Sequence, residues 1–219
     1  MTFHIPCLRT LLYLFIIVFP SAYVFFLKAI CFSRKSKLLQ DNLPVIIVYG
    51  MLTAIGLFSA LMGNFKLDSS LYWYPLAIIV GAFNISIEYF EAALPVYLKQ
   101  KKFPNLSPTS VYKEPFSLTG LLSIFFAATL EELVFRQFMI SGIFIELGLP
   151  IVLMILLSSL FYAINHVYYG TFVVLQKFTS GLVFSIVFVM SGYNIIIASL
   201  CHITQNLLLY LYSVDKKKT

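Results

Sequence analysis

Three short motifs in the second half of the 219-residue chain combine residue types that can act on water. In chain order they read Glu131-Glu132-x-x-x-Arg136, Tyr162-x-x-x-His166 and His202-x-x-x-Asn206. A carboxylate beside an imidazole can take a proton from a water molecule. A second imidazole and an amide can donate hydrogen bonds to an oxyanion as it forms. A base, a water molecule and oxyanion donors together are suited to hydrolysis of an amide bond.

The same residue types are also metal ligands. Glu131, His166 and His202 could hold a zinc ion with one coordination position open. The sequence therefore predicts hydrolytic chemistry and leaves a metal-free and a metal-dependent reaction both open.

Helical spacing separates the two adjacent carboxylates. Residues four apart share a face of an α-helix, so we expect an ion pair between Glu132 and Arg136. Glu131 lies about 100° round the helix from Glu132 and misses that pairing. One carboxylate is then neutralised, whereas the other is left for another task. The alternative is one buried network that serves packing alone, but it would leave Glu131 without a partner.

The composition places these motifs in a membrane. Hydrophobic residues make up 60% of the chain and charged residues 11%, against about 45–50% and about 25% in soluble domains. These values exclude an ordinary water-soluble fold, a disordered chain and a disulfide-stapled secreted module. We predict an all-α, polytopic transmembrane helical bundle of about seven spans, within a range of six to eight. Ionisable groups inside such spans are costly and indicate function.

Apolar runs and the polar breaks between them give the expected spans. They cover residues 11–30, 45–62, 73–98, 116–147, 150–166, 171–190 and 193–213. Gly148 and Pro150 favour a break after the fourth span, and Ser191-Gly192 favours a turn after the sixth. The first run is read as an uncleaved span interrupted by Pro20. If Pro20 divides it into a hairpin, the count becomes eight and the N-terminus changes side.

Distances along the helices predict that the motifs meet. Glu131 and His166 each lie 16 residues from the nearer end of the turn at residues 147–150. At 1.5 Å per residue, both are about 24 Å from that turn. His202 and Asn206 lie roughly 14–21 Å from the next turn on the same side. We therefore expect these four side chains to converge in one cavity.

The basic residues fit a single orientation. The net charge is +6, and eleven basic residues fall on one side of a seven-span bundle. They are Lys28, Arg34, Lys35, Lys37, Lys99, Lys101, Lys102, Lys113, Lys216, Lys217 and Lys218. The positive-inside rule puts this side in the cytoplasm, with the N-terminus outside and the cavity in the cytoplasmic half. No basic stripe suited to DNA is present, so nucleic acid is not an expected partner.

Three further charged residues lie inside the expected spans. Glu88 and Glu91 are interpreted first as solvated carboxylates near the membrane interface, with a substrate or proton role as the alternative. Lys177 is expected to snorkel toward the interface or to pair inside the bundle. The three cysteines have no metal-ligand spacing and are interpreted as buried apolar residues.

The three motifs, taken together and in this order, resemble those of the CAAX-protease and bacteriocin-processing (CPBP, or Abi) family of intramembrane proteases. The family's pattern is Glu-Glu-x-x-x-Arg, Phe-x-x-x-His and His-x-x-x-Asn, and the resemblance covers about residues 116–213. Tyr162 stands where the family has Phe, which keeps the aromatic packing and adds a hydroxyl near His166. The first three spans carry no resemblance that bears on function.

The resemblance implies an all-helical endopeptidase within the membrane. Glu131 and His166 would activate the water, and His202 and Asn206 would form the oxyanion hole. The supporting residues would be Glu132, Arg136 and Tyr162. Both a metal-dependent and a metal-free glutamate mechanism have been argued for the family, so the resemblance leaves zinc open as a cofactor.

We expect one integral membrane domain, comprising spans 1–3 with a cytoplasmic loop (residues 1–115), a catalytic core (116–213) and a basic tail (214–219). The compact size favours the bacterial cytoplasmic membrane. The substrate would be a membrane-associated protein or a secreted peptide, with a role in bacteriocin immunity or peptide maturation. Cleavage of prenylated CAAX proteins is less favoured, because small bacterial chains seldom meet them. The oligomeric state is not predicted.

Two other functions fit the same residues. A non-catalytic immunity or scaffold protein could keep the fold and act by binding a toxin or receptor. A small proton-coupled transporter could use Glu131, Glu132, His166 and His202 as titrating groups. The sequence shows no internal repeat, which argues mildly against the transporter.

Overall fold

The computed structural model describes residues 20–31, 37–58, 64–103 and 117–215. Its α-helices are α2 (Pro20–Cys31), α3 (Lys37–Phe58), α4 (Trp73–Gln100), α5 (Leu118–Glu132), α6 (Ile151–Ile164), α7 (Thr171–Met190) and α8 (Ile195–Asp215). A π-helix, η1 (Leu133–Phe144), continues α5, and a 3-10 turn, η2 (Val167–Tyr169), follows α6. Across the described residues the structure is helical apart from an isolated bridge between Lys66 and Asn194. The all-α prediction is confirmed.

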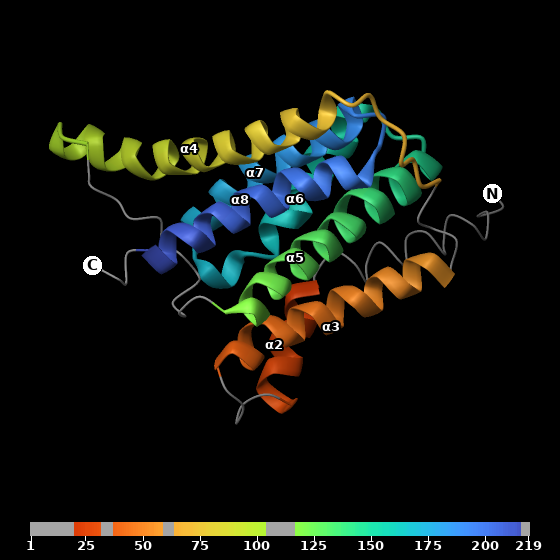
Figure 1. The fold of residues 1–219 in the computed structure, drawn as a ribbon, viewed down its shortest axis with the longest axis horizontal. Coiled ribbons are helices and arrows are strands. Elements are labelled where there is room, and N and C mark those ends of the chain that lie inside the picture. Colours follow the sequence, from red (N-terminus) through yellow and green to blue (C-terminus); the bar gives the residue numbers. More distant parts are fainter. Residues whose placement is uncertain (1–19, 32–36, 59–63, 104–116, 216–219) are drawn as a thin grey trace, which may run out of the picture.

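The helices form a membrane bundle (Figure 1). Those long and apolar enough to cross a bilayer are Trp73–Gln100, Leu118–Phe144, Thr171–Met190 and Ile195–Tyr212, and the shorter apolar ones are Pro20–Ile30, Leu43–Phe58 and Ile151–Ile164. The helix predicted at residues 171–190 has those bounds, and the one predicted at 73–98 extends to Gln100. The first part of the run at 11–30 and the last part of the run at 45–62 lie outside the described residues.

The fourth predicted span differs from expectation in its helix type. It is α-helical only as far as Glu132 and then becomes the π-helix η1. The backbone N–H groups of Ile145 and Leu149 donate to carbonyls five residues earlier, those of Ile140 and Phe144. Such wide turns are rare in helices and are concentrated at functional sites. Here the change of helix type comes directly after the paired carboxylates.

The segment η1 forms the centre of the bundle. Residues 134–144 are all buried, so the helix contacts protein on every side. Its Phe135 and Phe138 belong to one apolar core with Phe184 and Phe188 of α7. As predicted, the segment then ends in a break, where Gly148 adopts a φ of +65° and Pro150 caps α6.

Helices α4 and α8 approach each other closely and lie side by side in Figure 1. A Cβ atom at Gly81 of α4 would collide with the backbone carbonyl of Cys201 in α8. One turn further along, Asn84 Nδ2 donates a hydrogen bond of 2.8 Å to Gln205 Oε1. Small residues and interhelical hydrogen bonds between side-chain amides hold membrane helices together, because lipid provides no hydrophobic driving force between them. The position of α8, which carries His202, therefore depends on α4.

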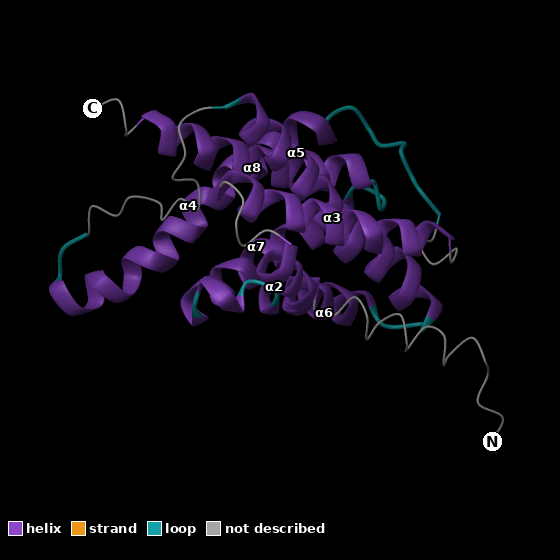
Figure 2. Ribbon diagram, turned by 90° about the horizontal axis from the view of Figure 1, so that it is seen from below, coloured by secondary structure: helices purple, strands orange, loops and turns teal. Residues whose placement is uncertain are grey.

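Helix α2 packs against the turn that follows α6. The Ser21 backbone N–H at the start of α2 donates to Asn165 Oδ1 at 2.8 Å. Phe25 stacks on Tyr168 with ring centroids 5.4 Å apart and the planes 3° from parallel. Figure 2 shows the bundle from below, and α2 also packs against α3. A helix near the N-terminus thus supports the turn that contains His166.

The contact at Gly81 leads to a prediction about stability. Gly81→Val should destabilise the protein by about 1–3 kcal/mol, because the added side chain meets backbone that cannot move aside. Thermal unfolding in detergent would measure the effect. Gly50→Ala is the matched control, because no atom lies within 4 Å of a Cβ at that position. Equal melting temperatures for Gly81→Val and wild type would contradict the close α4–α8 packing.

Candidate active site

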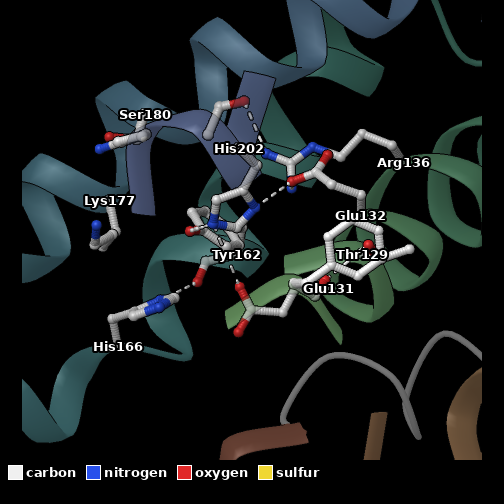
Figure 3. Close-up of polar contacts among 12 residues, drawn as sticks. Thr129, Glu131, Glu132, Arg136, Tyr162, His166, Lys177, Ser180 and His202 are labelled. Atoms are coloured by element: carbon white, nitrogen blue, oxygen red, sulfur yellow. Dashed lines mark hydrogen bonds and ion pairs between the residues drawn. The ribbon is translucent and has the colours of Figure 1, made fainter. Parts of the chain in front are cut away.

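His202 lies at the centre of a buried polar cluster to which several helices contribute (Figure 3). Its Nδ1 is 2.8 Å from Glu132 Oε1. Its Nε2 is 3.4 Å from the Tyr162 hydroxyl and 3.9 Å from Glu131 Oε2. Because a carboxylate only accepts hydrogen bonds, Nδ1 carries a proton and Nε2 faces Tyr162 and Glu131. The side chain of His202 is only 2% exposed.

Glu132 and Arg136 form the expected ion pair. Arg136 Nη1 is 3.1 Å from Glu132 Oε1, and neither side chain is exposed. Arg136 Nη2 also donates to the backbone carbonyl of Gly181 in α7 at 3.1 Å. The guanidinium lies over the Tyr162 ring, 4.8 Å from its centroid. A charge buried so deeply is tolerated only with such partners.

Glu131 differs from its neighbour, as the helical spacing predicts. Its side chain is 15% exposed, whereas that of Glu132 is fully buried. It faces the Nε2 atom of His202 rather than pairing with Arg136. The adjacent carboxylates are therefore in two environments: one is neutralised in the core, and the other is partly open.

His166 lies just beyond the C-terminal end of α6. Its Nδ1 is 2.9 Å from the backbone carbonyl oxygen of Tyr162, one helical turn earlier. A carbonyl oxygen only accepts, so Nδ1 carries the hydrogen and the lone pair is on Nε2. The rings of His166 and Tyr162 meet edge to face, with centroids 4.8 Å apart. The imidazole is thus fixed in the tautomer that can accept a proton.

The expected place of the Tyr162 hydroxyl requires a correction. The sequence places it near His166, but among the described residues its hydrogen-bond partner is His202. The spacing of four residues brings the Tyr162 ring, not the hydroxyl, against His166. The hydroxyl is at the far end of the ring and reaches across to α8. Tyr162 therefore links the two histidines, one through its ring and the other through its oxygen.

Asn206 is not joined to this cluster in the structure. It lies one helical turn beyond His202 and is partly exposed. No hydrogen bond within the described residues connects its side chain to Glu131, His166 or His202. The neighbouring amide of Gln205 is used instead for the bond to α4. The structure thus brings together Glu131, Tyr162 and His202, with His166 beside them, and leaves Asn206 apart.

Helix α6 is too short to cross a membrane. It has 14 residues and is about 21 Å long, against the roughly 30 Å of hydrocarbon in a bilayer. The turn that contains His166 follows its C-terminal end. Irregular backbone within a membrane must meet protein or water.

The arrangement does not fit a metal site. Within the described segments, no three His, Cys, Asp or Glu side chains come together in a way that could hold a metal ion. The proposed ligand set of Glu131, His166 and His202 is therefore not assembled, and no step below depends on a metal.

The charged residues outside the motifs form a second cluster. Lys177 of α7 binds Glu88 of α4 with Nζ 2.9 Å from Oε1, so the expectation that it pairs inside the bundle is confirmed. The interpretation of Glu88 as a solvated interfacial carboxylate is wrong, because its side chain is only 13% exposed. Glu91 likewise accepts a hydrogen bond of 2.6 Å from Thr179. Residues of α7 thus bind Oε1 of each carboxylate, which hydropathy alone does not reveal, while the buried Oε2 of Glu91 has no partner in the described residues.

Removing one member of the Glu132–Arg136 ion pair should lower the stability of the protein. Arg136→Met should destabilise the protein by about 3–5 kcal/mol, because Glu132 is left as a buried, unbalanced charge. Combining it with Glu132→Gln should recover part of the loss, since both charges are then removed. Chemical unfolding in detergent would compare the single and double variants. A double variant no more stable than Arg136→Met would show that the two side chains are not coupled.

Comparison with known proteins places the motifs in a family. Residues 113–208 match the family described as Type II CAAX prenyl endopeptidase Rce1-like, and this segment contains all three motifs. The match confirms the resemblance to the CPBP proteases and, with the apolar helices, supports an integral membrane endopeptidase. No curated protein and no solved structure matches the chain.

Proposed function

Because residues 113–208 belong to the Rce1-like type II CAAX prenyl endopeptidase family, we propose that the protein is an intramembrane endopeptidase that uses Glu131 and His166 to activate water. The observation that carries this proposal is the unequal environment of the two adjacent carboxylates. Glu132 is neutralised by Arg136, whereas Glu131 is partly exposed beside the imidazole of His202. A free carboxylate in a site of low dielectric is a strong base for a bound water molecule.

The first step is attack by water on the peptide bond. A water molecule held between Glu131 and Nε2 of His166 gives a proton to the carboxylate, and its oxygen bonds to the substrate carbonyl carbon. The fixed tautomer of His166 supports this role, because Nε2 can accept a hydrogen bond from the water. When the C–N bond breaks, the proton on Glu131 passes to the leaving amine. No other co-reactant is needed.

His202 and Asn206 are proposed to stabilise the oxyanion. Glu132 accepts from His202 Nδ1 and so orients the ring; in the imidazolium form of His202, Nε2 would donate to the oxyanion. The Tyr162 hydroxyl lies at the same position and is a second donor. Asn206 would engage the substrate on the next turn of α8. This role requires the substrate to reach Asn206, because no hydrogen bond in the described residues joins Asn206 to the cluster around His202.

Water is proposed to reach the site through the turn after α6. This turn ends a helix shorter than the bilayer, and Val167 and Tyr168 within it are exposed. Non-helical backbone at membrane depth is tolerated where it borders water or protein. The positive-inside pattern of the sequence would place this opening toward the cytoplasm, and we keep that orientation as part of the proposal.

We further propose a membrane-associated protein or a secreted peptide as substrate, in the bacterial cytoplasmic membrane. Bacteriocin immunity and peptide maturation are the roles proposed for it. The family's description names prenyl substrates, which are a less favoured choice for a chain of this compact size. The division into residues 1–115, a catalytic core at 116–213 and a tail at 214–219 belongs to the same proposal.

Two variants test the water-activating pair. Glu131→Gln and His166→Ala should each lower cleavage of lipid-anchored peptides by about 10²–10⁴-fold, because each removes a group that handles the proton of the water. The assay is peptide cleavage in detergent micelles, read by mass spectrometry. Glu146→Gln is the matched control for the loss of a carboxylate. A chelator should leave wild-type cleavage unchanged, since no described residues form a metal site.

Other results would contradict the proposal that the protein is an endopeptidase. A wild-type protein that cuts no peptide, together with full biological function in Glu131→Gln, would contradict the endopeptidase and favour a scaffold. Substrate-driven flux in proteoliposomes would favour a transporter.

Tyr162→Phe tests the oxyanion arrangement. This change restores the residue type of the family pattern and keeps the ring that packs on His166 and Arg136. We expect kcat to fall about tenfold with KM nearly unchanged, because only a transition-state donor is lost. Steady-state kinetics on a cleaved peptide would measure both constants. An unchanged kcat would mean that the hydroxyl serves only to orient His202.

A further inference from the structure

A second polar cluster lies beside the candidate active site, between α4 and α7. Glu88 Oε1 accepts hydrogen bonds from Lys177 Nζ at 2.9 Å and from Ser180 Oγ at 2.7 Å. Gln176 Nε2 also donates to the Glu88 backbone carbonyl at 2.8 Å. Three side chains of α7 thus converge on one residue of α4. Polar contacts of this density inside a membrane bundle indicate a function beyond packing.

The cluster is close to the active-site residues. In Figure 3, Lys177 lies between Ser180 and His166, on the side of the site away from Arg136. The Lys177 ammonium is close enough to interact electrostatically with both Glu131 and His166. Glu88 in turn interacts with His166. The Lys177 ammonium is therefore paired with Glu88 but stays within electrostatic range of the carboxylate that is proposed as the base.

Most of the other charged side chains around Glu88 and Lys177 have partners of their own. Those nearby are Glu91 on α4, Glu131 and Glu132 on α5, Arg136 on η1, His166 after α6 and His202 on α8. Arg136 is bound to Glu132, and Glu91 accepts from Thr179. Among the described residues Glu131 makes no salt bridge with a lysine or an arginine, and its Oε2 lies 3.9 Å from Nε2 of His202. Glu131 is thus the alternative partner for Lys177.

We propose that Glu88 is a positioning residue of the active site: it binds Lys177 and holds the ammonium away from Glu131, so that the Glu131 carboxylate stays available to water. The effect of Glu88 on catalysis rests on the proposed function, whereas the pairing of Lys177 with Glu88 does not. Glu88 precedes the family-matched residues 113–208, so the N-terminal half of the chain would complete the site.

The physical basis is the cost of an unpaired charge. An ammonium that is only 19% exposed in an apolar bundle needs a carboxylate partner. Lysine has a long, flexible stem and can turn to another partner within reach. Once the negative charge of Glu88 is removed, the remaining partner is Glu131. A carboxylate that is tied to an ammonium is a weaker base and leaves the water unactivated.

The test combines cross-linking with kinetics on the full-length protein in detergent. Dicyclohexylcarbodiimide, an apolar reagent, joins a carboxylate to an adjacent lysine amine as an amide, which mass spectrometry locates. Wild type should give the Glu88–Lys177 amide. Glu88→Gln should give the Glu131–Lys177 amide instead, and its kcat should fall about tenfold with KM little changed.

Two further variants make the result specific. Glu88→Gln combined with Lys177→Met should return kcat to within about twofold of wild type, because the displaced charge is gone. Glu91→Gln removes a carboxylate one turn along α4 that does not bind Lys177, and it should change neither the cross-link nor kcat.

Three outcomes would decide whether Glu88 holds Lys177 away from Glu131. Loss of activity in Glu88→Gln without a Glu131–Lys177 cross-link would overturn the proposal and leave Glu88 with a packing role. A double variant as impaired as Glu88→Gln would do the same. If the cross-link moves as expected but no variant, including wild type, cleaves a peptide, the positioning of Lys177 is supported and the endopeptidase is overturned.

Discussion

The site is organised around the buried ion pair of Glu132 and Arg136. Neither side chain reaches solvent, so the pair exists only because each charge satisfies the other and finds further partners. Arg136 extends to the Gly181 carbonyl of α7, and Glu132 extends to His202 of α8. Two helices that are distant in sequence are thereby fixed against η1. The same pairing leaves Glu131 without Arg136 as a partner, so one electrostatic requirement both joins these helices and leaves available the carboxylate that is proposed as the base.

Much of the architecture follows from local sequence signals. The ends of α4 and α7 agree with prediction because apolar runs, Gly and Pro specify them directly. The Glu132–Arg136 pair was predictable because it depends only on helical spacing. The π-helix η1 was not, since no residue pattern in the segment marks the change from α-helical to wider turns. The contacts of His202 with Glu132 and of Lys177 with Glu88 join residues 70 and 89 positions apart, and neither hydropathy nor spacing encodes such partners.

Helices outside the family-matched segment also position the site. α4 approaches α8 at Gly81 and binds α7 through Glu88, while α2 supports the turn with His166 through Asn165. The motifs that are proposed to be catalytic therefore depend on the N-terminal helices for their geometry. Because lipid provides no hydrophobic drive between helices, these contacts are made by small residues, amides and ion pairs. This explains why charged residues outside the motifs occur in so apolar a chain.

The central claim is that Glu131 acts as a base on water rather than attacking the substrate itself. A single turnover in ¹⁸O-labelled water tests it most directly. The account predicts one ¹⁸O atom in the new C-terminal carboxylate of the product and none in the enzyme peptide that contains Glu131. Label in Glu131, or no cleavage by a folded wild-type protein, would contradict it.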